Sequence, residues 1–410
     1  MSSFTTRLLV AALLVGTSTA AQAGAGNGIR VGGSDGRLHP FVELEARYDS
    51  DVYVNVANGP SAGDLILHVR PGLTLAIPGE LTSVDFFGQL DWAQYLGASD
   101  SRTTDLSKLY AEARLGVGVN RKGTVGLELS NLFRRSDQPA AQSLSLGVTS
   151  NYNELDLRVP YHPGGGALTV TAGGGWALET YESQFKGFLC APGNPYCDAS
   201  TLAKLGYNQL TASGDVSWRF LPRTSAIFEA SYFKRLPNSS LGSDGGGVRV
   251  ATGITGLVTP HLAATAKVGY GATTGVTPSL STWLITASGE WLPTETASVK
   301  GSYSHDFAVD PQATYDVNRL ALDARYLAGG RLTLAFHAGW DRLGYASTSA
   351  TTNILVVSPA VDYDVARWLR AEVAYAYTDR SNNGLGASTA SLPAVAYSKS
   401  EAWLKLVFTY

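Results

Sequence analysis

The last nine residues, Ala402-Trp-Leu-Lys-Leu-Val-Phe-Thr-Tyr410, have the period-2 pattern of a β-strand with two unlike faces. Successive side chains of a strand point to opposite sides of its sheet. One side carries only apolar residues, namely Ala402, Leu404, Leu406, Phe408 and Tyr410. A terminal strand with an apolar face and a free edge invites aggregation, so this strand needs a partner. The pattern predicts that it pairs with the first strand and closes the sheet.

The N-terminal residues have the features of a secretory signal. Arg7 supplies a positive charge, residues 8–15 form a short apolar run, and residues 21–23 (Ala-Gln-Ala) are a small-residue cleavage site. An apolar run of this length is too short to span a bilayer. The predicted segments are a signal peptide at 1–23, a flexible periplasmic tail at 24–38 and one folded unit at 39–410.

The composition excludes several classes of protein. Charged residues make up only 16% of the sequence, and the mean hydropathy is zero. After residue 23 no apolar stretch reaches about 18 residues, so no transmembrane helix is predicted. Strands with one apolar and one polar face give such an average. The net charge of −3 does not indicate a nucleic-acid partner.

Alternation continues along the chain. Residues 109–117, 320–326 and 369–377 place charged side chains on one face and apolar side chains on the other. A helix would spread these charges through its apolar face, so the periodicity favours strands. The alternating segments are roughly 9 to 14 residues long, which exceeds the usual length of strands in globular domains.

Short and long connections alternate between these segments. Eight short turns and nine long polar loops imply eighteen strands, with both chain ends on the short-turn side. Short periplasmic turns and long external loops are typical of bacterial outer-membrane barrels. The long loops are predicted at 50–62, 97–104, 136–141, 185–205, 236–246, 272–279, 308–314, 345–352 and 380–398.

These patterns predict an all-β fold, a transmembrane antiparallel up-and-down β-barrel of about 18 strands with both termini periplasmic. Such a sheet must close, because hydrocarbon cannot satisfy an unpaired backbone edge. The expected location is the outer membrane of a Gram-negative bacterium, with lipid around the barrel. Phe408 and Tyr410 are predicted to be the signal that the barrel-assembly machinery recognises.

The face opposite the apolar one carries charges of both signs. A barrel of this size encloses water, and such charges can line the lumen and pair across neighbouring strands. No ring of a single sign is present, so polar or neutral sugars suit this lumen better than strictly selected ions. The predicted pore-lining residues are Glu43, Glu45, Arg47, His68, Arg70, Asp85, Asp91, Glu112, Arg114, Glu128, Glu154, Asp156, Arg158, Asp215, Arg219, Glu229, Lys267, Lys300, Arg319, Asp323, Arg325, Arg370, Glu372 and Lys405.

Two cysteines, Cys190 and Cys197, lie in a loop rich in proline and glycine. In an exported protein two cysteines at this spacing predict a disulfide, because the compartment is oxidising. The loop at 185–205 is the longest, and the loop at 380–398 is also long. Either is a candidate to fold inward as a constriction or to close over the mouth as a lid.

The signs of catalysis are weak. Ser304-His305-Asp306 has the residue types of a catalytic triad, but neighbours on a strand point to opposite faces. Asp51, Asp64 and Asp100 do not have the spacing of a calcium-binding loop. We predict a non-enzymatic protein with no catalytic residues, no cofactor and no metal site, and we expect His305 at the external rim.

The early segment resembles a known family. Residues 48–53 (Tyr-Asp-Ser-Asp-Val-Tyr), 61–65 (Ser-Ala-Gly-Asp-Leu) and 69–73 (Val-Arg-Pro-Gly-Leu) resemble the opening hairpin of the putative beta-barrel porin 2 family. They also resemble outer-membrane barrels of bacterial exopolysaccharide export systems, including the myxobacterial ones. The resemblance implies a final conduit for a secreted polysaccharide. The helical repeat domain of some polysaccharide porins is missing, so a periplasmic polysaccharide export partner would be a separate protein.

Three hypotheses about function remain open at this point. The first is a channel through which a hydrophilic polymer, an exopolysaccharide, leaves the cell. The second is a general diffusion porin for small hydrophilic solutes. The third is a structural or adhesive barrel that acts through its loops.

Overall fold

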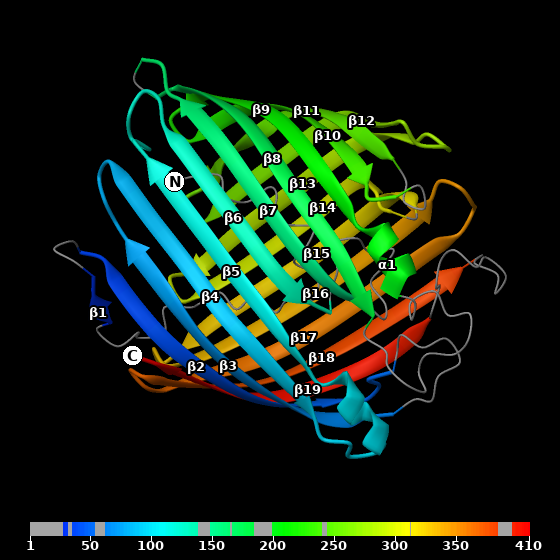
Figure 1. Ribbon diagram of the computed structural model, residues 1–410. Coiled ribbons are helices and arrows are strands. Elements are labelled where there is room, and N and C mark those ends of the chain that lie inside the picture. Colours follow the sequence, from blue (N-terminus) through cyan, green and yellow to red (C-terminus); the bar gives the residue numbers. More distant parts are fainter. Residues whose placement is uncertain are drawn as a thin grey trace.

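In the computed structural model the chain forms a β-sheet that closes on itself, with two short helical segments at one rim (Figure 1). The structure describes residues 28–31, 35–53, 62–137, 148–164, 166–183, 199–239, 244–311, 313–383 and 396–410. The strands are β1 Ile29–Arg30, β2 Arg37–Asp49, β3 Asp64–Ile77, β4 Thr82–Tyr95, β5 Lys108–Val119, β6 Leu127–Ser136, β7 Val148–Tyr161, β8 Leu168–Ser183, β9 Tyr207–Leu221, β10 Thr224–Pro237, β11 Gly245–Thr259, β12 Leu262–Thr274, β13 Ser281–Thr294, β14 Ala297–Val309, β15 Thr314–Ala328, β16 Leu332–Tyr345, β17 Thr351–Ala366, β18 Leu369–Asn383 and β19 Tyr397–Thr409. The helical segments are the 3-10 helix η1, Ser101–Leu106, and the α-helix α1, Ala199–Leu205.

The last long strand closes the sheet against the first one. The sheet has 19 strands, of which β1 has two residues and pairs with β2, so eighteen strands form the barrel. β19 pairs antiparallel with β2 and sets Lys405 opposite Glu45. Beyond this ladder the Tyr410 N–H donates to the carbonyl oxygen of Pro40 at 3.1 Å. The predicted all-β barrel of about eighteen strands and its closure by the C-terminal strand are confirmed.

The two rims differ as the connections predict. The rim at which β19 ends carries short connections, such as the two residues between β9 and β10. The opposite rim carries the long connections, with η1 and α1 among them (Figure 1). β2 begins at Arg37, and Ile29 and Arg30 pair with its first two residues, so part of the predicted 24–38 tail joins the sheet. The predicted signal peptide at 1–23 lies outside the described residues.

The two faces of the barrel wall differ in chemistry. Leu320, Trp283 and Val373 are 52%, 65% and 58% exposed, and their face of the wall is predominantly apolar, although Asn131 of β6 and Asn153 of β7 also lie on it. In a membrane barrel lipid covers such a surface, so exposed apolar side chains are expected there. With strands about 4.8 Å apart and tilted by about 40°, eighteen strands enclose a cylinder roughly 36 Å across between backbones.

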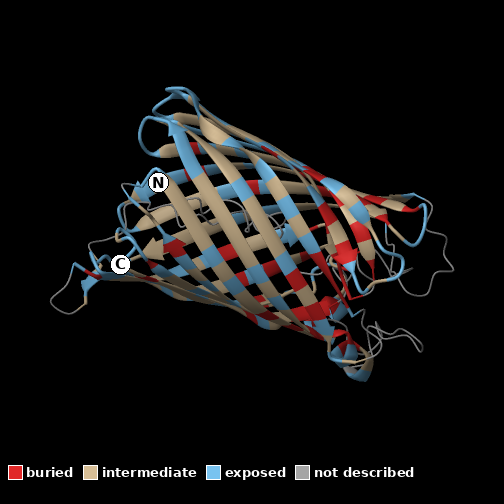
Figure 2. Ribbon diagram, turned by 90° about the horizontal axis from the view of Figure 1, so that it is seen from above, coloured by how far each residue is buried: buried red, intermediate tan, exposed pale blue. Residues whose placement is uncertain are grey.

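The described residues form no central hydrophobic core inside the barrel. Its buried residues gather toward the rim that carries the long connections (Figure 2). There they form separate small clusters, such as Leu202 and Leu205 of α1 against Val148, Tyr181 and Tyr207. The outer rim is therefore the part of the structure that is packed like a globular protein, and the middle of the barrel is an open wall.

Candidate functional site

All the predicted pore-lining residues lie on one face of the sheet. The register pairs Glu43 with Arg70 and Lys300 with Asp323, and the other predicted residues follow the same alternation around the barrel. This face is opposite the exposed apolar one and is therefore the inner face of the wall. The role of these residues in lining a pore stays a prediction, but their common orientation is a property of the fold.

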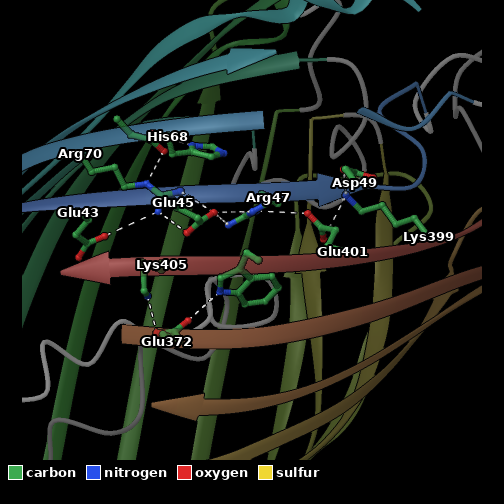
Figure 3. A network of polar contacts seen from close by, with 12 residues as sticks. Glu43, Glu45, Arg47, Asp49, His68, Arg70, Glu372, Lys399, Glu401 and Lys405 are labelled. Atoms are coloured by element: carbon green, nitrogen blue, oxygen red, sulfur yellow. Dashed lines mark hydrogen bonds and ion pairs between the residues drawn. The ribbon is translucent and has the colours of Figure 1, made fainter. Parts of the chain in front are cut away.

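Strands β18, β19, β2, β3 and β4 bring the densest group of charges together. We call this group the wall network; its members are Glu43, Glu45, Arg47, Asp49, His68, Arg70, Asp91, Glu372, Lys399, Glu401, Trp403 and Lys405 (Figure 3). Its hub is Glu45, which is 4% exposed and accepts hydrogen bonds from Arg47 and Arg70, each at 2.7 Å. Arg70 continues the network to Asp91 at 2.9 Å.

The network extends in both directions from this hub. Arg47 reaches Glu401 at 3.4 Å, and Lys399 then bridges Glu401 and Asp49 at 3.4 and 3.1 Å. Lys405, also on β19, pairs with Glu372 of the neighbouring strand β18 at 2.7 Å. Sequence analysis had not singled out Asp49, Lys399, Glu401 or Trp403. The signal was present, because residues 399, 401, 403 and 405 share the period-2 face of the closing strand that carries Lys405.

Ion pairs of this kind recur around the wall. Lys267 pairs with Glu229 at 2.9 Å, Arg370 with Asp362 at 2.6 Å, and Arg319 donates to Asp341 at 3.1 Å. Other predicted wall residues lie outside the network on their own strands, among them Asp85, Asp156, Arg158, Asp215 and Arg325. Because positive and negative groups pair with one another across strands, the inner face is polar and its ion pairs combine both signs of charge.

The upper end of β14 leaves the wall and folds inward. Its ladder with β13 ends at the pair Ile285–His305, whereas its ladder with β15 continues to Val309. Phe307 then packs against Phe233 of β10, with ring centroids 6.3 Å apart. Strands β10 and β14 are separated by three others, so this contact runs across the concave side of the barrel. We call the described residues 306–311 and 313–315 the infolded hairpin.

Glycines make room for the infolded hairpin. A Cβ on Gly271 of β12 would lie 2.5 Å from the Phe307 ring, and one on Gly247 of β11 would lie 2.7 Å from it. Such distances are shorter than carbon atoms tolerate. Glycine at these positions of β11 and β12 therefore lets the Phe307 ring pack directly against the backbone of the inner face.

Polar contacts hold the same segment. Arg249 of β11 donates to Asp306 at 2.9 Å and to the Phe307 carbonyl at 2.7 Å, and its guanidinium lies 4.3 Å from the Phe307 ring centroid. At the tip, Asp310 accepts from Tyr315 at 2.7 Å and lies 4.0 Å from Arg235 of β10. The infolded hairpin is thus held against the inner faces of β10, β11 and β12 on the lumen side of the wall.

Whether either of the two loops predicted as a constriction or lid has that role stays a prediction. These loops are at 185–205 and 380–398, and residues 184–198 and 384–395 lie outside the described part of the chain. Cys190 and Cys197 lie in the first of these stretches, so their disulfide stays a prediction. Within the described residues α1 packs on the inner wall beside β7, β8 and β9. The segment at 308–314 is among the predicted long loops, but no feature of the sequence indicated that it lies in the lumen.

The β4–β5 connection at the outer rim is braced by two aspartates. Asp64 is fully buried and accepts from the N–H groups of Gly97 and Ala98 at 3.1 and 2.7 Å. Asp100 caps η1 and accepts from the Arg102 side chain at 2.6 Å. Hydrogen bonds from Arg102 hold the pKa of Asp100 below its ordinary value. Within the described residues no group of three or more metal-ligating side chains is formed.

Ser304, His305 and Asp306 do not converge. The His305 ring hydrogen-bonds Asn318 at 3.0 Å, on the outer face of the β14–β15 ladder. Asp306 points inward to Arg249. Adjacent strand residues therefore point apart, as the alternation predicts.

Aromatic side chains form belts at the two rims of the outer face. Trp92, Tyr232 and Tyr375 are exposed toward the outer rim, and Trp218, Trp291 and Trp368 toward the other. Such belts mark the two interfaces of a membrane. Tyr95, Phe233 and Tyr345 lie near the same rim but face inward and are packed in clusters.

A closed eighteen-stranded barrel with an apolar exterior, aromatic belts and a charged interior is a bacterial outer-membrane barrel of the porin class. The sequence matches the family described as "Putative beta-barrel porin 2" over residues 22–395, and the chain belongs to this family. The family resemblance inferred from the opening hairpin is thereby confirmed. No curated protein matches the sequence. The described residues include no helix long and apolar enough to cross a membrane.

Solved structures share the barrel at low sequence identity. A mutant of the ferric enterobactin receptor PfeA from Pseudomonas aeruginosa, in complex with enterobactin, is 8% identical with a TM-score of 0.50, over 93% of this chain and 82% of that chain. The siderophore receptor PirA from the same organism is also 8% identical, with a TM-score of 0.45 over 91% and 80%. At this identity the similarity shows the fold alone.

Proposed function

We propose that this outer-membrane barrel is a hydrophilic channel through which a secreted polysaccharide, an exopolysaccharide, leaves the cell. The observation that carries the proposal is the inner wall, where carboxylates and basic groups pair across strands instead of forming a ring of one sign. A hydrated polymer can slide along such a wall, because no strong single-sign field arrests it. The early resemblance to exopolysaccharide export barrels supports the choice of cargo.

The proposal includes the partners that export requires. The barrel has no enzymatic role, lies in outer-membrane lipid and reaches the membrane through the barrel-assembly machinery. A separate periplasmic polysaccharide export protein would deliver the polymer to the rim where β2 begins and β19 ends. The polymer would leave past the infolded hairpin.

Deletion of the gene, followed by an assay of surface polysaccharide, tests this function. We expect loss of the surface polymer and its recovery when the wild-type gene is restored. Unchanged surface polysaccharide together with altered uptake of small solutes would overturn the export proposal.

A general diffusion porin is the second candidate, and the infolded hairpin favours it. A segment that narrows the lumen suits the sieving of small solutes by size. Liposome swelling with sugars of graded size separates the candidates. Swelling that falls off steeply with sugar size would support the diffusion porin, and no swelling with any of the sugars would exclude it.

A further inference from the structure

Two aromatic rings lie against the inner wall near the periplasmic rim. Phe41 of β2 stacks on Phe87 of β4, with centroids 5.9 Å apart and planes inclined by 20°. The ring of Phe41 crosses β3 at Gly72, where a Cβ would lie 2.3 Å from the Phe41 Cζ. Glycine at this position lets the ring bridge two strands. Both rings are half-buried, so they remain accessible from the lumen.

A cation extends this surface to β5. The Arg114 guanidinium lies 5.6 Å from the Phe87 ring centroid, and its side chain is 51% exposed. Arg114 also pairs with Glu112 on its own strand. Together Phe41, Phe87 and Arg114 form a flat surface with apolar faces and a polar edge, which we call the lower platform.

A second platform lies higher on the same side of the barrel. Trp403 of β19 faces inward opposite Arg47, whose guanidinium is 5.2 Å from the indole centroid. The indole N–H donates to Glu372 at 2.8 Å, which fixes the ring orientation. We call Arg47 and Trp403 the upper platform.

The spacing of the platforms suits a chain molecule. Phe41 and Arg47 are six residues apart on β2, which corresponds to roughly 20 Å along the strand. The paired charges of the wall network, centred on Glu45 and Arg70, lie between them. The same side of the lumen therefore presents aromatic faces, then hydrogen-bonding groups, then aromatic faces again.

This sequence of surfaces matches the chemistry of a saccharide. A pyranose has an apolar C–H face, which packs on the electron-rich face of an aromatic ring, and a rim of hydroxyls that needs donors and acceptors. Solute anions would gain little from the electron-rich aromatic faces, solute cations would meet the guanidinium groups already placed on them, and a purely apolar solute would not need the paired charges. We propose that the two platforms are stacking sites for sugar units, so the inner wall from β18 to β5 is a carbohydrate-binding track. This inference rests on the proposed channel function and names the chemistry of its cargo.

Blockade of single channels by an oligosaccharide tests the track. The purified full-length protein is placed in a planar bilayer, and blocking events are recorded with maltohexaose and with a polyethylene glycol of equal hydrodynamic size. We expect the sugar to dwell longer than the glycol in the wild type. Phe87→Leu and Trp403→Leu keep apolar volume but remove the flat ring, and each should shorten the sugar dwell time about three- to tenfold. The matched control Phe228→Leu changes an exposed ring on the outer face and should leave the dwell time unchanged.

The possible results distinguish failure of the carbohydrate-binding track from failure of the channel function. Two results would overturn the carbohydrate-binding track while leaving a conducting channel. One is a sugar dwell time in both inner-wall variants that equals the wild-type value. The other is an equal dwell time for sugar and glycol in the wild type. A folded barrel that conducts no ions at all would overturn the channel function itself. A variant that loses both sugar dwell and open-channel conductance has lost its pore, and Phe41→Leu then provides the independent test at the lower platform.

Discussion

Replacing Gly247 and Gly271 together by alanine should release the infolded hairpin and raise the conductance of the channel. At Gly271 the added Cβ would lie 2.5 Å from Phe307, and at Gly247 it would lie 2.7 Å from both Phe307 and Phe233. Overpacking of this kind costs roughly 1 to 3 kcal/mol at each site. The double variant therefore loses roughly 2 to 6 kcal/mol in the packed arrangement.

The interactions that hold the hairpin are of similar size. Burial of the Phe307 side chain contributes about 1.5 to 3 kcal/mol. The hydrogen bonds of Arg249 to Asp306 and to the Phe307 carbonyl involve a charged group and contribute about 1.5 to 3 kcal/mol each. One added methyl should weaken the packed state, whereas two should populate the displaced state substantially.

Single-channel recording in planar bilayers measures the effect. We expect the double variant to show a larger or more variable open conductance than the wild type. Gly301→Ala is the matched control, because a Cβ at that glycine meets nothing within 4 Å. Heat-modifiable migration in gels establishes that each variant still forms a barrel. A folded double variant with wild-type conductance would refute the inference that this hairpin narrows the lumen.

Three further predictions concern other parts of the chain, and a fourth concerns pH. Serine at Cys190 and Cys197 should change the protease sensitivity of their loop but not barrel assembly; loss of assembly would contradict this. Removing Tyr410 should lower the amount of protein inserted in the membrane, since its N–H and its aromatic ring both act at the closing seam; normal levels would count against that role. Glu45→Gln removes the carboxylate that Arg47 and Arg70 share, while Arg47 keeps Glu401 and Arg70 keeps Asp91; it should lower stability by about 1 to 3 kcal/mol, measured as a shift in denaturant midpoint, and an unchanged midpoint would show that the Glu45 charge does not stabilise the fold. Because the pKa of Asp100 is lowered from 3.8, its contribution to the β4–β5 loop should be present above about pH 4 and lost below it; pepsin cleavage of this loop that starts already at pH 5 would disagree.

The barrel could be predicted from the sequence because its rule is local. Side chains alternate every residue, so Leu320 and Asp323 must face opposite sides whatever the rest of the chain does. Closure followed from the chemistry of lipid, which leaves no backbone edge unpaired. Most of the charged residues of the inner face could therefore be listed before any contact was known, although Asp49, Lys399 and Glu401 were not among them.

The contacts themselves could not be predicted in the same way. That Glu45 meets both Arg47 and Arg70 depends on the register between strands, which alternation does not specify. The infolded hairpin was still harder to predict from the sequence, because Phe307 and Val309 follow the same alternation as the lipid-facing residues. Only their distant partners, Gly247 and Gly271 among them, reveal that they turn inward, and this needs a three-dimensional fold.

The point at which β14 separates from β13 also indicates how deeply the barrel lies in the bilayer. Above the pair Ile285–His305, no strand of the described chain continues the ladder on that edge of β13. Acyl chains cannot form hydrogen bonds with the backbone groups on that edge of β13, whereas hydrated lipid headgroups can. The oily layer of the outer leaflet must therefore stop at or beneath this pair, which puts the exposed indole of Trp283 at the polar boundary and His305 among the headgroups.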